Sequence, residues 1–153
     1  MIHPPGRDED GGTDVGREDG AALVEFALVV TLLLTLVIGT ITYGLILGLH
    51  QSVTHAASAA ARSAVVVPGE DAAVVSRAET VATEQLSWLG SKADVLTVEV
   101  PTPTPCPGVP SARCVTVTVR YPYQEHPLIP SFLGLPVPEQ IASTATLELE
   151  DVA

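Results

Sequence analysis

The strongest pattern in the chain is an uninterrupted apolar run near its N-terminus. Residues 21–49 contain only two side chains that can ionise, Glu25 and Tyr43. A helix needs about 20 such residues to cross the ~30 Å hydrocarbon core of a bilayer. The run therefore predicts one transmembrane helix, and the Ala-rich sequence after it extends the predicted helix to about residue 66.

The residues after this helix show first helical and then alternating periodicity. Pro68 and Gly69 end the first helix, and apolar residues recur at helical spacing from Val74 to Leu89, which predicts a second, amphipathic helix. Trp88, near the end of that helix, is interpreted as a core or membrane-interface residue rather than a platform for a ligand. Three segments then alternate apolar and polar residues with a period of two, which predicts strands at 95–100, 115–121 and 141–149.

Together these elements predict an α+β fold, in which a long transmembrane helix is followed by a second amphipathic helix and a three-stranded antiparallel sheet. Residues 1–20 form a polar leader, which we expect to be cytoplasmic and cleaved. Residues 21–49 form the anchor, and residues 67–153 form a small extracytoplasmic domain. We expect the N-terminus inside because Arg7 and Arg17 precede the apolar run, whereas only Arg62 follows it closely.

Charge and motif content exclude several functions. The net charge is -11, and the seven Lys and Arg residues are scattered, so nucleic acid is not an expected partner. The sequence has no phosphate-binding loop and no nucleophile–base or metal-ligand signature. Its four histidines are dispersed, at His3, His50, His55 and His126. We therefore expect no enzymatic activity, no cofactor, no metal and no small-molecule substrate.

Two Pro-rich tracts interrupt the predicted strands. The first, 100–106, is predicted to be an extended, polyproline-like connection. It ends at Cys106, and the only other cysteine is Cys114. A zinc site needs two more ligands that are not nearby, so we predict a disulfide, which suits an oxidising compartment outside the membrane. The second tract, 122–138, either folds back over the sheet or contacts a partner or the membrane surface, because it carries several apolar side chains: Leu128, Ile129, Phe132, Leu133 and Leu135.

The boundary between the leader and the anchor carries a further pattern. Gly20 is followed by Ala21 and, five residues after the glycine, by Glu25. This spacing resembles a type IV prepilin processing site, at which a membrane-embedded peptidase cuts after the glycine. The resemblance implies a cut between Gly20 and Ala21. The new α-amine, with a pKa of about 8, would lie one helical turn from Glu25 and could pair with it, or with the same acid of a neighbouring subunit.

More specifically, the run GAALVEFALV from Gly20, the pair Tyr43-Gly44 and the Ala-rich segment ending at Arg62 resemble the TadE family. These are pilin-like proteins, or pseudopilins, of the bacterial tight-adherence secretion and pilus system. The resemblance covers residues 17–66 and is supported by the tract CVTVTVRYPY near the sheet. It implies assembly roles for Glu25 and Phe26, although Tyr is common in these pilins where Phe26 stands. It also implies three partners: a prepilin peptidase, other pilin-like subunits and tight-adherence assembly proteins.

Two other interpretations remain open from the residues alone. The chain could be an unprocessed, single-pass anchor whose domain or loop 122–138 captures a ligand. Alternatively, the small residues 57–59 could form a signal-peptidase site that releases a secreted domain, although the apolar run is long and its leader acidic. Finally, Gly44 and Gly48 form a GxxxG pattern, which would let a second helix approach closely.

Overall fold

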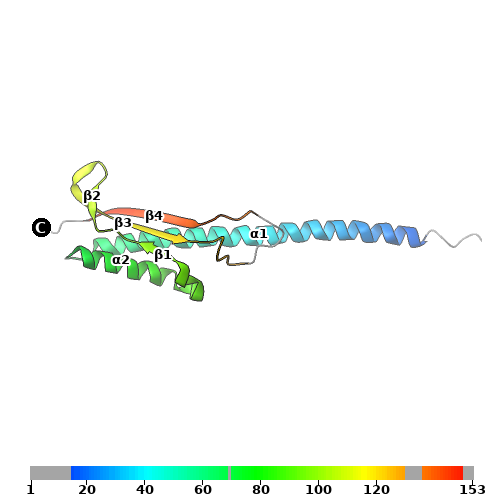
Figure 1. Cartoon of the computed structure of the whole chain (residues 1–153). Helices are drawn as coiled ribbons and strands as arrows, with labels where there is room; N and C mark the ends of the chain where they lie inside the picture. Colours follow the sequence, from blue (N-terminus) through cyan, green and yellow to red (C-terminus); the bar gives the residue numbers. More distant parts are fainter. Residues whose placement is uncertain (1–14, 69, 130–135, 150–153) are drawn as a thin grey trace, which may run out of the picture. The chain divides into compact units, whose positions relative to one another are not determined.

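The computed structural model describes residues 15–68, 70–129 and 136–149. Residues 1–14, which make up most of the leader, lie outside this part, as do Gly69 and residues 150–153. The same is true of 130–135, which include Phe132, Leu133 and Leu135 of the second Pro-rich loop. Figure 1 shows the elements in chain order: α1 (Val15–Val65), α2 (Asp71–Gln85), η1 (Ser87–Val95), β1 (Thr97–Glu99), β2 (Thr104–Cys106), β3 (Val109–Tyr121) and β4 (Ile141–Leu149). The predicted α+β class is confirmed.

The chain divides into two compact units, residues 1–40 and 41–153, and the boundary falls within α1. In the first unit the described residues, 15–40, are entirely helical. The helix from Gly20 onward is long and apolar enough to cross a membrane: its most apolar 18-residue window has a mean hydropathy of 2.6, and none of that window is buried. Large apolar side chains such as Leu23, Phe26 and Leu32 are more than 60% exposed.

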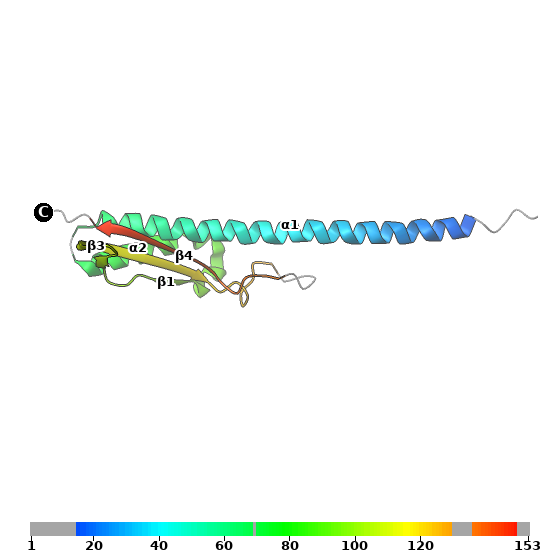
Figure 2. The same cartoon turned by 90° about the horizontal axis from the view of Figure 1, so that it is seen from above.

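In the second unit, α1 is a core element. Figures 1 and 2 show that α2 and the sheet lie along the part of α1 that belongs to this unit. The face of α1 that packs into the core is recognised by its spacing of three or four residues and its small side chains. It comprises Ile46, Leu49, Val53, Ala56, Ala57, Ala60, Ala61 and Ala64. Because most of these residues are alanines, the other elements can approach the helix closely.

The rest of the core comes from α2 and from one face of β3. On α2 the buried residues are Val74, Ala78, Val81 and Ala82. On β3 the apolar positions of the alternating pattern, Val115, Val117, Val119 and Tyr121, are fully buried. The polar positions between them, Thr116, Thr118 and Arg120, remain partly exposed. The period-two pattern thus places one face of β3 in the core, as the sequence predicted.

The sheet has four antiparallel strands, with β3 in the centre. β4 pairs along one edge of β3, from Tyr121 opposite Ile141 to Arg113 opposite Leu149. The other edge is shared by β1 and β2. The strand β2 is the difference from the predicted three-stranded sheet, because the end of the tract expected to be polyproline-like turns back at Gly108, which has a φ of 84°, and pairs with β3. Pro105 is tolerated there because β2 is an edge strand.

The second predicted helix is divided. α2 ends at Gln85, and a 3-10 segment, η1, carries the chain on from Ser87 to Val95. Inside η1, Gly90 has a φ of 58° and a ψ of -131°, a conformation that favours glycine. Leu89 is buried, but Trp88 is 59% exposed. Of the two interpretations of Trp88, the core position is therefore wrong.

Candidate functional site

The residues of the predicted processing and assembly site lie on α1 in the first unit. Gly20, Ala21, Glu25 and Phe26 are all helical and exposed. Ala21 and Glu25 are four positions apart in the helix, which places them on the same face about 6 Å apart along the axis. Within the described residues, the Glu25 side chain has no ion pair or hydrogen bond. The arrangement therefore leaves one carboxylate on an apolar helix, without a cation to balance it among those residues.

Gly20 is not required by packing against any described residue. α1 begins at Val15, so Gly20 is a helical residue, and a Cβ built on it meets nothing within 4 Å. A glycine in a helix interior costs about 1 kcal/mol relative to alanine. Its presence here makes the helix locally easier to unwind at the Gly20–Ala21 bond.

Gly44 and Gly48 show the same property in the second unit. Both are exposed, and a Cβ built on either meets nothing within 4 Å. They lie on the side of α1 away from the buried positions Ile46, Leu49 and Val53. No described residue therefore uses the close approach that the GxxxG pattern permits, and its role in helix packing stays a prediction.

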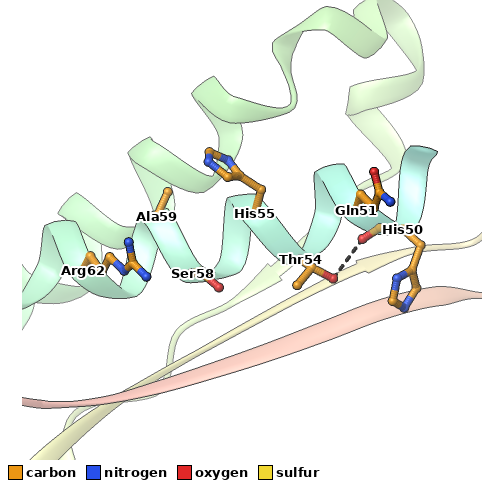
Figure 3. A pocket seen from close by; sticks show the side chains of 7 residues that line it. All are labelled: His50, Gln51, Thr54, His55, Ser58, Ala59 and Arg62. Carbon is orange, nitrogen blue, oxygen red and sulfur yellow. Dashed lines mark hydrogen bonds between the residues drawn. The ribbon is translucent and has the colours of Figure 1, made fainter. Parts of the chain in front are cut away.

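Further along α1, the outward face carries an open groove of about 580 Å³. All its lining residues come from this one helix: His50, Gln51, Thr54, His55, Ser58, Ala59 and Arg62. Figure 3 shows that His50 and His55 point to different sides of the helix, and that the Thr54 hydroxyl donates a hydrogen bond to the His50 carbonyl oxygen, at 2.9 Å. In the part of the chain that the structure describes, no three His, Cys, Asp or Glu side chains gather into a possible metal site.

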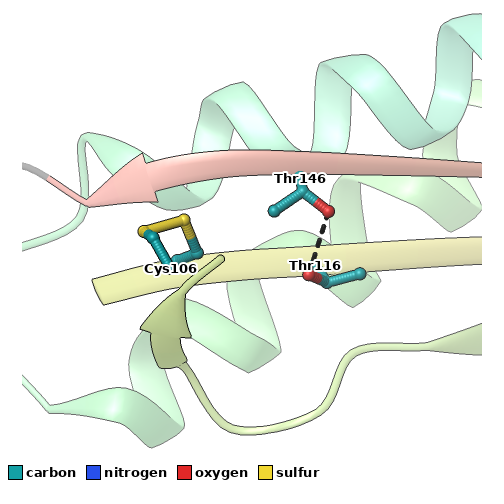
Figure 4. Close-up of a disulfide and its surroundings, with 4 residues drawn as sticks. Cys106, Thr116 and Thr146 are labelled. Carbon is teal, nitrogen blue, oxygen red and sulfur yellow. Dashed lines mark hydrogen bonds between the residues drawn. A yellow bond between two sulfur atoms is a disulfide. The ribbon is translucent and has the colours of Figure 1, made fainter. Parts of the chain in front are cut away.

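The two cysteines form the predicted disulfide. The bond joins Cys106 on β2 to Cys114 on β3, with their Cα atoms 5.0 Å apart, and both side chains are buried. Figure 4 shows it beside the pair of threonine hydroxyls that connects β3 to β4, Thr116 and Thr146, whose oxygens are 3.0 Å apart. The disulfide fastens the short β2 strand to β3, the central strand of the sheet.

The described residues of loop 122–138 fold back onto the second unit. The Tyr43 hydroxyl donates to the Pro136 carbonyl oxygen at 3.0 Å, and the Lys92 ammonium donates to the Pro127 carbonyl oxygen at 2.8 Å. Leu128 packs against the core. Sequence reasoning missed the roles of Tyr43 and Lys92, because a single hydroxyl or ammonium group carries no sign of a carbonyl partner distant in sequence.

Two tyrosines where β3 passes into this loop are fully buried. Tyr121 and Tyr123 are at most 1% exposed, and their ring centroids lie 6.3 Å apart. The Tyr121 hydroxyl donates to the His126 carbonyl oxygen at 2.6 Å. Burial raises the pKa of both phenols, and the neighbouring Tyr123 raises the pKa of Tyr121 further. Both phenols are therefore favoured in their neutral form in the folded core at this end of the sheet.

Comparison with known proteins identifies one segment. Residues 20–62 match the model of a family described as TadE-like protein. The matched segment contains the predicted processing and assembly residues and ends at Arg62, the last residue of the groove on α1. It confirms the resemblance to the TadE-like family over that segment. No curated protein and no solved structure matches the chain.

Proposed function

We propose that this chain is a membrane-anchored, pilin-like subunit of a tight-adherence pilus or secretion system, and that it acts by lateral packing of α1 rather than by catalysis. The single observation that carries the proposal is Glu25. It is the only acid in the apolar run 21–49, it is exposed on α1, and no described residue pairs with it.

The physical argument starts from the cost of that carboxylate. A charged side chain at the centre of a membrane helix costs about 2.5–3.5 kcal/mol, and less toward the membrane edge, so such residues are kept mainly where they have a partner. Cleavage after Gly20 would supply one, because it converts the Ala21 nitrogen into a cationic amine on the same helical face as Glu25. Either this amine or that of a neighbouring subunit would stabilise the carboxylate. Pairing between subunits would also fix their axial register, as single polar residues do in coiled coils.

Other features of α1 support the proposal. The segment that matches the family lies entirely within α1. Gly44 and Gly48 have no side chains, so they leave space on the outward face of the helix, as close packing of a second helix requires. We propose further that a prepilin peptidase removes residues 1–20, that the N-terminus is cytoplasmic and that the second unit is extracytoplasmic. The disulfide fits that compartment.

The test compares two truncations to alanine in the native host. Glu25→Ala removes the unpaired acid, whereas Leu23→Ala shortens a similarly exposed apolar side chain on the other side of the same turn. Both variants should insert, as judged by resistance to alkaline extraction. Only Glu25→Ala should lose cross-linking between subunits. Equal cross-linking in the two variants would refute an assembly role for Glu25 and favour a tethered binding module.

Processing is tested separately, by N-terminal sequencing and intact mass of protein from native membranes. A start at Ala21 supports the pilin-like subunit. A start at Met1 supports the unprocessed anchor, and a start at Ala60 supports a secreted domain. Replacing Gly20 by Leu should block a cut at this bond and leave insertion unchanged.

A further inference from the structure

Most large apolar side chains that the second unit leaves exposed come from two short segments. Four lie on α1, and one is the tryptophan of η1. They are Ile41 (53% exposed), Tyr43 (42%), Leu45 (40%), Leu47 (63%) and Trp88 (59%), which we call the apolar end. Among the described residues of this unit, the other large exposed apolar side chains are Val66 and Val109. Scattered single residues of this kind are common, but a gathered set of them needs an explanation.

The contacts of α2 place the start of η1 at the level where the apolar run of α1 ends. Gln85, the last residue of α2, lies beside Gly48 and Ser52 of α1, so η1 begins at this level of the helix. Lys92 of η1 donates to a carbonyl of loop 122–138, and another carbonyl of the same loop accepts from Tyr43. Figures 1 and 2 both show the end of α2 at the same end of the sheet as the end of β3, after which loop 122–138 begins.

Helix length decides what lies next to this end. Residues 21–40 of α1 rise about 30 Å, the thickness of the hydrocarbon core. The whole apolar run, 21–49, rises about 44 Å, which matches the ~40–45 Å of a bilayer with its headgroup layers. The second unit begins at Ile41. The helix therefore leaves the hydrocarbon core and crosses one headgroup layer within residues 41–49, which also belong to the folded unit.

We propose that the apolar end rests in a headgroup layer of the membrane, with Trp88 and Tyr43 as interfacial anchors that set the depth and tilt of the folded unit. Trp and Tyr favour this layer because each combines a large apolar ring with a polar group that keeps a hydrogen bond, which the Tyr43 hydroxyl makes with the Pro136 carbonyl oxygen. The ligand is the phospholipid surface itself. The inference rests on the membrane anchoring in the proposed function, but not on subunit assembly.

Charge indicates what holds the unit there. Residues 41–153 carry eleven Asp and Glu against five Lys and Arg, so an anionic lipid surface would repel the second unit. The one ammonium group on η1, Lys92, is already bound to a carbonyl oxygen. Attachment must therefore come from the apolar and aromatic side chains, and zwitterionic phosphatidylcholine is the appropriate lipid for a test.

Trp88 is the only tryptophan of the chain, so its own fluorescence is the probe. The full chain is inserted into phosphatidylcholine vesicles whose acyl chains carry bromine either near the headgroup or near the chain end. We expect emission to be blue-shifted relative to the urea-unfolded chain, strong quenching by the shallow bromines, weaker quenching by the deep ones and protection from aqueous iodide. The matched control moves the probe in the double variant Trp88→Phe, Val109→Trp, because Val109 is exposed at the opposite end of β3 from the loop. This tryptophan should be quenched by iodide and not by bromine.

Two results would overturn the inference. If iodide quenches Trp88 as strongly as the control tryptophan and bromine has no effect, the apolar end faces water. If Trp88 is shielded from iodide but bromine still has no effect, protein covers it, for example a second copy of this chain. Flotation of the same vesicles distinguishes this inference from the proposed function. A chain that floats with the vesicles while bromine fails to quench Trp88 is still anchored in the membrane, so only the inference about the apolar end is refuted.

Discussion

The packing of the sheet against α1 makes a prediction that can be tested with one pair of substitutions on one strand. Val117 is fully buried in the centre of β3, and Val109, on the same strand, is 49% exposed. Replacing either by alanine removes the same two carbons from the same strand, and the two positions differ chiefly in the burial of the side chain. The difference between the two variants therefore measures what burial on the core face contributes.

The magnitude follows from the atoms removed. Val→Ala deletes two carbons, worth about 0.8 kcal/mol each when fully buried, and the cavity left behind adds to this. For Val117→Ala we expect the free energy of unfolding to fall by about 2–3 kcal/mol. For Val109→Ala, whose side chain is half in water already, we expect a loss of less than about 1 kcal/mol.

The assay must follow the sheet and not the membrane helix, which keeps its backbone hydrogen bonds in a bilayer or micelle whatever the sheet does. The near-ultraviolet circular dichroism of Tyr121 and Tyr123 meets this requirement, because both rings are enclosed in the same core as Val117. The full chain in micelles is unfolded with urea and the midpoints are compared. Equal losses in the two valine variants would show that the β3 face in the core does not contribute the stability we assign to it.

Three further predictions concern the sheet and its connections. Replacing Cys106 and Cys114 by serine should lower the free energy of unfolding by about 2.5 kcal/mol, the value expected for a disulfide that spans a sequence separation of 8. Amide hydrogen exchange should then rise first at β2. Unchanged exchange at β2 would contradict the role of the disulfide in fastening that strand. Burial raises the pKa of Tyr121 and Tyr123, so the unfolded state loses these phenolic protons at a lower pH than the folded state. The free energy of unfolding should therefore hold up to a pH of about 10 and fall above it. In urea titrations, the variant with Phe at both positions should lose that dependence on pH. Gly90→Ala should cost about 1–3 kcal/mol in thermal unfolding, because its backbone conformation is unfavourable for a residue with a Cβ.

Periodicity predicted the parts of the fold that a local pattern determines. The segment 141–149 coincides with β4, and the buried face of β3 was read correctly from alternation. β3 itself begins six residues before the predicted 115, because Pro110 and the polar residues after it interrupt the alternation although the backbone continues to pair. β2 was missed for a related reason, since its pairing depends on the turn at Gly108 and on the disulfide rather than on its own composition.

Hydropathy could not predict the division of α1. A helix that is apolar all round gives the same signal whether lipid or protein surrounds it. Ile46 and Leu49 are buried in the second unit, whereas Leu45 and Leu47 are exposed, yet all four read as anchor residues in the sequence. The distinction depends on which side of the helix the sheet covers, and that is determined by tertiary packing.

The candidate site was partly predictable because it has a local motif. Gly20, Ala21 and Glu25 are recognised by spacing alone, and the structure places them on a helix, where that spacing has geometric meaning. The surface that we propose rests on the membrane was predicted only in part, through Trp88 as a possible membrane-interface residue and through the apolar residues of loop 122–138. It depends on Tyr43 and Lys92 holding a loop from elsewhere in the sequence against the unit.

The two sides of α1 in the second unit suggest why its small residues are of two kinds. On the buried side they are alanines, such as Ala57 and Ala60, which are good helix formers, and the close approach of the core accounts for them. On the outward side they are glycines, Gly44 and Gly48, each of which costs about 1 kcal/mol in a helix and neither of which is needed to avoid a contact among the described residues. Alanine would serve the folded unit better at both positions. We expect a packed neighbouring helix to make use of these two glycines, because their lack of side chains permits a close approach.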